Sequence, residues 1–203
     1  MSKLDKLKKS LYSISANKTI GVPTELVDLY LDLNGFIGLE GALLGFPVNV
    51  DMECELFYFN RVDSWKIHYN QDVRDTFFFA TDIFCHLFGI YSGRVVKFNP
   101  ETGIIKEHSE SLEEWASTII SDYDYETGWS LASGWQKNNR ILQCSERLLP
   151  KIPFSLGGEF VVENLTPVTL SEAMLQYSKL YEQVKNIRQG DVVKIYKWLE
   201  RER

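Results

Sequence analysis

Four strand signals follow one another in the middle of the chain, with only short connections between them. Each is a run rich in aromatic or β-branched residues, the types that favour strands. Strands joined by such short connections predict an antiparallel meander at the centre of the fold. The predicted strands are residues 76–82 (TFFFATD), 83–91 (IFCHLFGIY), 95–98 (VVKF) and 104–107 (IIKE).

A turn and a capped helix complete this region. In residues 99–103 (NPETG), Asn and Pro start a type I turn, and Gly103 can adopt the left-handed conformation that returns the chain. Ser111 then serves as the N-cap of a helix, and Glu114 completes a capping box. The predicted inward stripe of this helix is Leu112, Trp115, Ile119 and Tyr123.

Helical periodicity is also found near the N-terminus. Residues 4–14 predict one helix, with lysines on its outer face, and residues 21–35 predict a second that stops at Asn34-Gly35. We interpret the glycines at 35, 38 and 41 as turns, because a dinucleotide fingerprint would follow a strand and not a helix. The two buried stripes are Leu4, Leu7, Leu11 and Ile14, and Leu26, Leu29, Tyr30 and Leu33.

The last third of the chain mixes both kinds of element. Residues 122–144 are predicted to be mostly helical, and residues 157–165 (GGEFVVENL) a strand. Thr169 with Glu172 caps a long helix, and residues 191–198 form a final strand. The sequence therefore predicts an α+β fold, a central antiparallel sheet flanked by helices.

Length and composition fit one globular domain. The 203 residues, 44% of them hydrophobic, can bury a substantial core. We predict a single domain over residues 1–203, with its core at about 1–145 and a C-terminal strand-helix-strand extension at about 146–203. No apolar run is long enough to span a bilayer, and the N-terminus lacks a secretory signal. The three cysteines form no CxxC pair, which favours a reducing cytoplasm.

Charge is unevenly distributed along the chain. Residues 21–136 carry 19 acids and six bases, whereas both ends of the chain are basic. Residues 107–126 alone hold seven acids and no Lys or Arg. Such a segment either keeps the surface solvated or docks a basic partner. Direct binding to nucleic acid is disfavoured, because a phosphate backbone requires a basic stripe.

The sequence contains no recognisable catalytic or metal-binding arrangement. Cys85 and His86 are adjacent, so on a strand they point to opposite faces and cannot act as nucleophile and base. Asp82 and His86 would lie about 13 Å apart on the same strand. Zinc-site spacings such as HExxH are absent, and no two carboxylates stand out as a glycosidase pair. We therefore expect a protein without enzymatic activity, metal or cofactor.

The order of these signals resembles the SUKH superfamily, which includes yeast cell-wall synthesis regulators and many bacterial immunity proteins. The shared features are a proline-led helix ending near Asn34-Gly35, an aromatic strand entering an Ala-x-Asp turn, a Thr-Gly hairpin and a Ser-x-Glu-Glu-Trp helix. They follow in order over about half the chain, and residues 153–165 also resemble the C-terminal extension of some bacterial members. Family members often have a glycine where this chain has Phe84-Cys85-His86. In this chain the strand enters the Ala-x-Asp turn over Phe79 to Asp82, the Thr-Gly hairpin is Glu101 to Gly103, and the Ser-x-Glu-Glu-Trp motif is Ser111 to Trp115.

The resemblance implies a binding protein that neutralises a cognate toxin by stoichiometric contact. Toxins bound by such immunity proteins are often basic nucleases, and an acidic surface would steer a basic toxin toward its site. The acids would attract the basic toxin, and the two tyrosines between them would provide aromatic contacts that slow its release. The predicted partner-binding residues are Glu110, Asp122, Tyr123, Asp124, Tyr125 and Glu126, with Asp51, Glu53 and Glu55 as a second patch.

Two other functions stay open from the sequence. A regulatory adaptor of the cell-wall synthesis regulator type would bind several cellular proteins through the same fold. An enzyme with an unrecognised carboxylate pair would show turnover that depends on two specific acids.

Overall fold

The structure is a computed structural model that describes residues 1–16, 21–187, 194 and 198–199. It is an α+β fold built on a seven-stranded sheet in which each strand pairs antiparallel with the next along the chain. Hence β1 and β7 are its two edges. The strands are β1 Leu11–Ser15, β2 Asn34–Gly38, β3 Leu43–Gly45, β4 Phe77–Thr81, β5 Leu87–Tyr91, β6 Arg94–Asn99 and β7 Ile104–Ser109.

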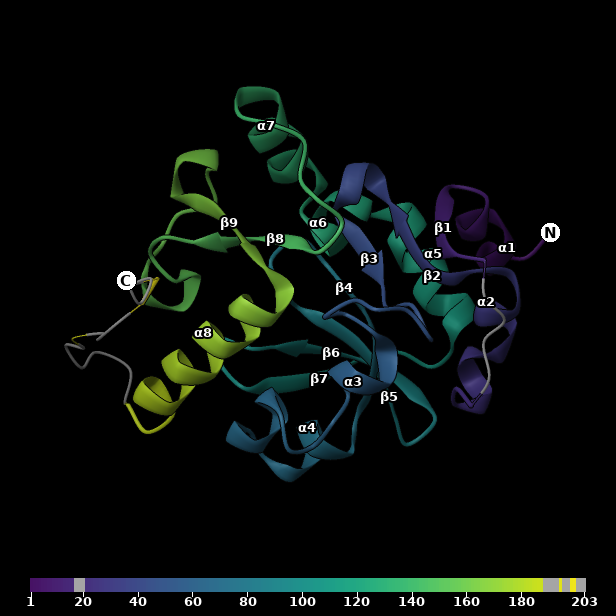
Figure 1. Cartoon of the computed structure of the whole chain (residues 1–203), viewed down its shortest axis with the longest axis horizontal. Coiled ribbons are helices and arrows are strands. Elements are labelled where there is room, and N and C mark those ends of the chain that lie inside the picture. Colours follow the sequence, from purple (N-terminus) through teal and green to yellow (C-terminus); the bar gives the residue numbers. More distant parts are fainter. Residues whose placement is uncertain (17–20, 188–193, 195–197, 200–203) are drawn as a thin grey trace.

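A two-stranded antiparallel sheet and eight α-helices complete the described part of the chain (Figure 1). The small sheet pairs β8 Glu146–Pro150 with β9 Leu165–Thr169. The α-helices are α1 Lys3–Lys8, α2 Val27–Asp32, α3 Leu56–Phe59, α4 Gln71–Asp75, α5 Leu112–Ser121, α6 Tyr123–Thr127, α7 Trp129–Asn138 and α8 Leu170–Val184. Short 3-10 helices are η1 Thr24–Leu26, η2 Leu39–Gly41, η3 Trp65–His68, η4 Phe154–Leu156 and η5 Val162–Asn164.

Helices cover both faces of the large sheet. Phe78 and Phe79 are neighbours on β4 and therefore point to opposite faces. Phe79 meets Trp115 of α5 edge-to-face at 5.3 Å between ring centroids, so α5 lies on one face. The ring centroids of Phe78 and Trp65 of η3 lie 5.6 Å apart, on the other face. Figure 1 shows α1, α2 and α5 grouped on one side of the molecule, and α8 with β8 and β9 on the other.

The C-terminal elements share the main core with the large sheet. Tyr177 of α8 is buried, and its hydroxyl donates to the backbone carbonyl of Phe84 at 3.1 Å. Tyr181 stacks on Tyr69, with ring centroids 4.7 Å apart. Leu149 of β8 also belongs to this core. Among the described residues, no helix is long and apolar enough to cross a membrane.

The central meander matches its prediction closely. Strands β4, β6 and β7, the turn with Gly103 at φ +67° and the Ser111 cap appear where expected, whereas β5 begins only at Leu87 because residues 83–86 form a turn. Ser111 accepts a hydrogen bond from the Glu114 amide at 3.2 Å, but the Glu114 carboxylate accepts from the Glu110 amide instead of closing the capping box. Tyr123 was expected to face inward; it is 40% exposed, because α5 ends at Ser121.

The N-terminal predictions were only partly correct. The first helix ends at Lys8, and residues 11–15 form β1, because they pair with β2. The second helix ends at Asp32, and Asn34-Gly35 begins β2 instead of a turn. Gly38 also lies in β2, where a side chain would meet Leu11 of β1 at 2.3 Å. Tertiary pairing therefore outweighed the local helix and turn signals.

The C-terminal predictions also need correction. Residues 157–165 were expected to form a strand, but the strand is β9, which begins at Leu165. The preceding loop is held by Asn164, whose side chain accepts from the Ile152 amide and donates to the Ile152 and Glu159 carbonyls. Residues 122–144 divide into α6, α7 and a non-helical segment after Asn138. The final strand predicted over residues 191–198 lies mostly outside the described residues.

Candidate functional site

The turn between β4 and β5 is organised by one buried carboxylate. Asp82 Oδ1 accepts from the backbone amides of Phe84 and His86, each at 2.9 Å. Its Oδ2 lies 2.8 Å from Nδ1 of the His86 ring. Cys85 occupies the tip with φ +68°. The expected separation of about 13 Å was wrong, because residues 83–86 leave the strand and fold back on Asp82.

Cys85 has no access to this site. Its side chain is fully buried, and burial raises the pKa of the thiol well above its ordinary value. A thiol in that condition does not supply a thiolate nucleophile. His86 is the accessible member of the turn, with its side chain 22% exposed.

A second network joins α6 to the sheet. Lys97 of β6 donates to the Glu126 carboxylate at 3.0 Å and to the Glu126 carbonyl at 2.9 Å. Nε2 of His108 on β7 lies 3.1 Å from the same carboxylate. Burial opposes ionisation of Glu126, but the hydrogen bond from His108 and the charge and hydrogen bond of Lys97 outweigh it and lower the pKa to about 2. Glu126 is therefore an ionised structural anchor.

These two networks border a groove of about 1020 Å³. The groove lies on the α5 face of the sheet, because Phe88 contacts both Trp115 and the groove residue His108. Strands β6 and β7 and the turn between β4 and β5 contribute to it, together with α6 and the start of α7. Its lining residues are Asp82, Phe84, His86, Lys97, Asn99, Thr102, Ile104, Lys106, Glu107, His108, Thr118, Asp122, Asp124, Tyr125, Glu126, Gly128, Ser130, Leu131 and Phe160.

The groove combines negative charge with exposed apolar groups. Five carboxylates and two lysines are among its lining residues. Ile104, Tyr125 and Phe160 also line it, with 49%, 79% and 61% of their surfaces exposed. Phe160 stacks on Phe154 with ring centroids 3.9 Å apart, so this part of the wall is held in place.

Four of the six residues predicted around α6 line this groove: Asp122, Asp124, Tyr125 and Glu126. Asp124 also accepts hydrogen bonds from the Ser130 amide and hydroxyl, at 2.7 and 2.8 Å, and so caps α7. Tyr123 packs edge-to-face on Trp129 and is not a lining residue. Glu110 is an exposed residue 3.9 Å from Arg94 and also lies outside the lining. Glu126 was predicted to contact a partner, but only 7% of its surface is exposed.

The second predicted patch lies elsewhere. Glu55 caps α3 by accepting from the Tyr58 amide at 2.8 Å. Phe59 of the same helix packs on Trp65, on the face of the sheet opposite α5. Asp51 and Glu53 are exposed beside this helix in the sequence, and neither lines the groove. The structure therefore does not join the two acidic patches into one site.

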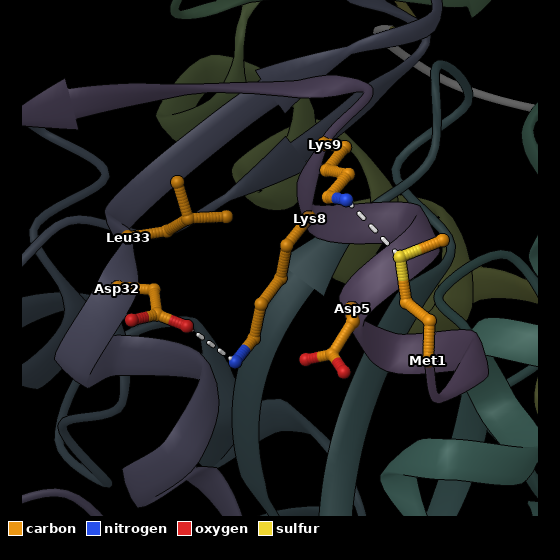
Figure 2. Close-up of a pocket in the computed structure, with 6 residues that line it drawn as sticks. All are labelled: Met1, Asp5, Lys8, Lys9, Asp32 and Leu33. Atoms are coloured by element: carbon orange, nitrogen blue, oxygen red, sulfur yellow. Dashed lines mark hydrogen bonds and ion pairs between the residues drawn. The ribbon is translucent and has the colours of Figure 1, made fainter.

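A smaller pocket of about 400 Å³ lies beside the N-terminus (Figure 2). Lys8 of α1 reaches across to α2, where its Nζ lies 2.7 Å from Asp32 Oδ2 and 2.7 Å from the Asp28 carbonyl. Lys9 donates to the sulfur of Met1. Two acids and two lysines line this pocket, so the charges of these four side chains balance. Its contacts link α1 to α2 and indicate a structural role.

Sequence reasoning missed the residues that the other strands bring into the groove. Ile104 and Phe160 were interpreted as ordinary strand residues, although both are exposed and line the groove. His86 was set aside because it was assumed to lie on a strand. The one available signal was Asp82 four residues before His86, a spacing that a tight turn can close. Within the described ranges, no group of three or more His, Cys, Asp or Glu residues is arranged to hold a metal ion.

Comparisons with known proteins show a similar fold, but they assign no family and no activity to this chain. Neither protein-family models nor curated proteins provide a match to this chain. Among solved structures, the fold is similar to the crystal structure of Atu4351 from Agrobacterium tumefaciens, with a TM-score of 0.56 and 17% sequence identity. The similarity covers 84% of this chain and 86% of that chain. At this identity the similarity shows a shared fold alone.

Proposed function

We propose that this chain is a non-enzymatic binding protein that neutralises a basic toxin by occupying it, as the resemblance to SUKH immunity proteins implies. The observation that carries the proposal is the groove, which combines an excess of carboxylates with three exposed apolar side chains. This is the combination that a stable complex with a basic protein requires. A nuclease-type toxin fits because such proteins carry positive charge to bind phosphates.

The two kinds of group have different roles in the proposed complex. Asp122 and Asp124 give the groove a negative potential, which raises the association rate of a basic partner. Tyr125 and Phe160 bury apolar and aromatic surface on contact, which slows dissociation. Glu126 contributes by fixing α6 on the sheet, since its carboxylate is already used by Lys97 and His108.

The absence of enzymatic activity remains part of the proposal. The ionisable groups nearest the groove floor are engaged with one another, and Cys85 is buried with a raised thiol pKa. We also infer a cytoplasmic location, because all three cysteines are free thiols, as a reducing compartment requires.

One observation favours an adaptor as a second candidate. Asp51 and Glu53 are exposed near α3, which packs on the face of the sheet opposite the groove. Two separate acidic surfaces would let one chain contact two partners, as a regulatory adaptor of the cell-wall synthesis regulator type does. Several weak partners, retained after the groove is altered, would favour that role.

The test compares two exposed tyrosines. Tyr125 on α6 is 79% exposed in the groove, and Tyr12 on β1 is 76% exposed at the far edge of the sheet. A basic protein captured on the tagged chain is purified and its affinity measured against Tyr125→Ala and Tyr12→Ala at low and high salt. We expect Tyr125→Ala to weaken binding about 30-fold or more, a hot-spot effect of ~2 kcal/mol, and Tyr12→Ala to leave it unchanged.

Charge is tested with Asp122→Asn and Asp124→Asn, which keep side-chain oxygens able to cap the helices. We expect the double variant to slow association and flatten its salt dependence. Equal effects of the two tyrosine variants, or salt dependence unchanged in the double variant, would exclude the groove as the binding site.

A further inference from the structure

The strand β7 is an edge strand with an open backbone. Among the described residues it pairs only with β6, and alternate backbone N–H and C=O groups of an edge strand point away from the sheet. In the part of the chain that the structure describes, no backbone hydrogen bond joins Ile105 to Ser109 to any element other than β6. Ile104, Lys106 and Glu107 are exposed, so no described element covers this edge.

The same strand borders the acidic groove. Four of its six residues line the groove: Ile104, Lys106, Glu107 and His108. A segment lying along β7 would therefore have backbone partners on one side and the carboxylates of α6 within reach of its side chains. In such strand addition, backbone hydrogen bonds supply affinity and alternate side chains supply specificity.

We propose that the partner binds by adding a basic, extended segment to the sheet at β7, as an eighth strand. This inference rests on the proposed function and specifies how the partner is held. The excess of carboxylates in the groove selects a segment with Lys or Arg, and the exposed Ile104 at the start of β7 selects an apolar residue beside them.

Lys106 argues for a foreign segment and against a second copy of this chain. It is the only Lys or Arg on β7, and it lies near the middle of the strand. Antiparallel pairing of two β7 strands would bring the two Lys106 side chains near each other, and a central lysine is a common protection against edge-to-edge pairing. A foreign segment can place an acidic or apolar residue at that position.

The probe is an acetylated and amidated peptide of alternating lysine and valine, titrated into the full chain and followed by amide resonances and hydrogen exchange. The control peptide has the same sequence with every backbone nitrogen methylated, so that it keeps its charge and loses its N–H donors. We expect the unmodified peptide to shift and protect amides of β7 but not of β1, the other edge. We expect the methylated peptide to bind at least about tenfold more weakly.

A variant pair adds a second readout. Lys106→Glu removes the positive charge beside the added strand and should strengthen binding of the unmodified peptide several-fold. Lys9→Glu makes the same change in net charge near the opposite edge and should have little effect.

The outcomes separate this inference from the proposed function. Equal binding of both peptides, with shifts confined to α6, would overturn strand addition and leave the groove as a side-chain site. Protection of β7 that depends on protein concentration alone would overturn it in favour of self-association. If neither peptide perturbed β7 or α6, both the strand addition and the basic specificity of the groove would be overturned.

Discussion

Asp82 fixes the β4–β5 turn through three hydrogen bonds from Phe84 and His86. Asp82→Ala would leave two amides and a ring nitrogen without their acceptor while only 2% of Asp82 is exposed to solvent. We expect the free energy of unfolding to fall by about 2–4 kcal/mol, measured by urea denaturation.

The matched control for this variant is Asp124→Ala. Asp124 also accepts two hydrogen bonds, from Ser130, but it lies at the surface, where water can replace it. A loss of about 1 kcal/mol is expected for a surface cap of this kind. Equal losses in the two variants would mean that burial of Asp82 does not strengthen its role.

For single residues, the sequence predicted which residues line the groove better than it predicted which side chains contact one another. The acids and tyrosines of residues 122–126 were recognised, and four of the predicted residues do line the groove. The pairing of Asp82 with His86 was excluded because a strand was assumed to continue through both. Lys66 was not singled out at all, yet it is 2% exposed and donates to the Thr76 carbonyl at 2.6 Å. Contacts made by folding a loop back on itself have no periodic signal.

The junction between α6 and α7 depends on Gly128. Its φ of +71° is in the left-handed region, and an added Cβ would lie 2.4 Å from a ring atom of Phe84. Gly128→Ala therefore combines backbone strain with a clash at the groove wall. We expect it to lower the free energy of unfolding by about 1–3 kcal/mol more than a glycine substitution that carries strain alone.

Gly157→Ala provides that comparison. Gly157 has φ +92°, and an added Cβ would meet no atom within 4 Å, so the cost is conformational, about 1–2 kcal/mol. Both variants are compared by thermal or urea unfolding. If they lose equal stability, the wall of the groove can yield to a methyl group, and packing does not fix the position of α6.

Elements with regular patterns were predicted best. The stripe Leu112, Trp115 and Ile119 is buried as expected, and α8 begins at its predicted cap, where Thr169 accepts from the Glu172 amide. The chain around β1 was misassigned because its apolar spacing fits a helix as well as a strand, and only pairing with β2 decides between them. Edge strands and short loops depend on partners distant in the sequence.

For the whole molecule, the charge asymmetry of the sequence becomes a distribution over faces. Four of the seven acids of residues 107–126 line one groove on the α5 face, whereas Asp51 and Glu53 lie near α3, on the other face. A sequence shows that acids are numerous, but the topology decides which of them act together. Strand β7 takes part in this arrangement in two ways: it lines the groove, and among the described residues only β6 pairs with its backbone.

Stability of the whole molecule in acid should depend on Glu126. Its pKa is about 2 in the folded protein, below the ordinary value of 4.5, because His108 and Lys97 stabilise the carboxylate more than burial disfavours it. Between these two pH values the unfolded chain binds more protons than the folded one, so the stability from this group is complete above about pH 4.5 and is lost as pH falls toward 2. The stability that this group contributes is at most about 3 kcal/mol.

The Glu126→Gln side chain cannot ionise, so this variant should lack that contribution. We therefore expect urea unfolding between pH 5 and about pH 2 to show the wild-type protein approaching the variant in stability. Parallel pH profiles for the two proteins would show that the Glu126 network does not link α6 to the sheet energetically.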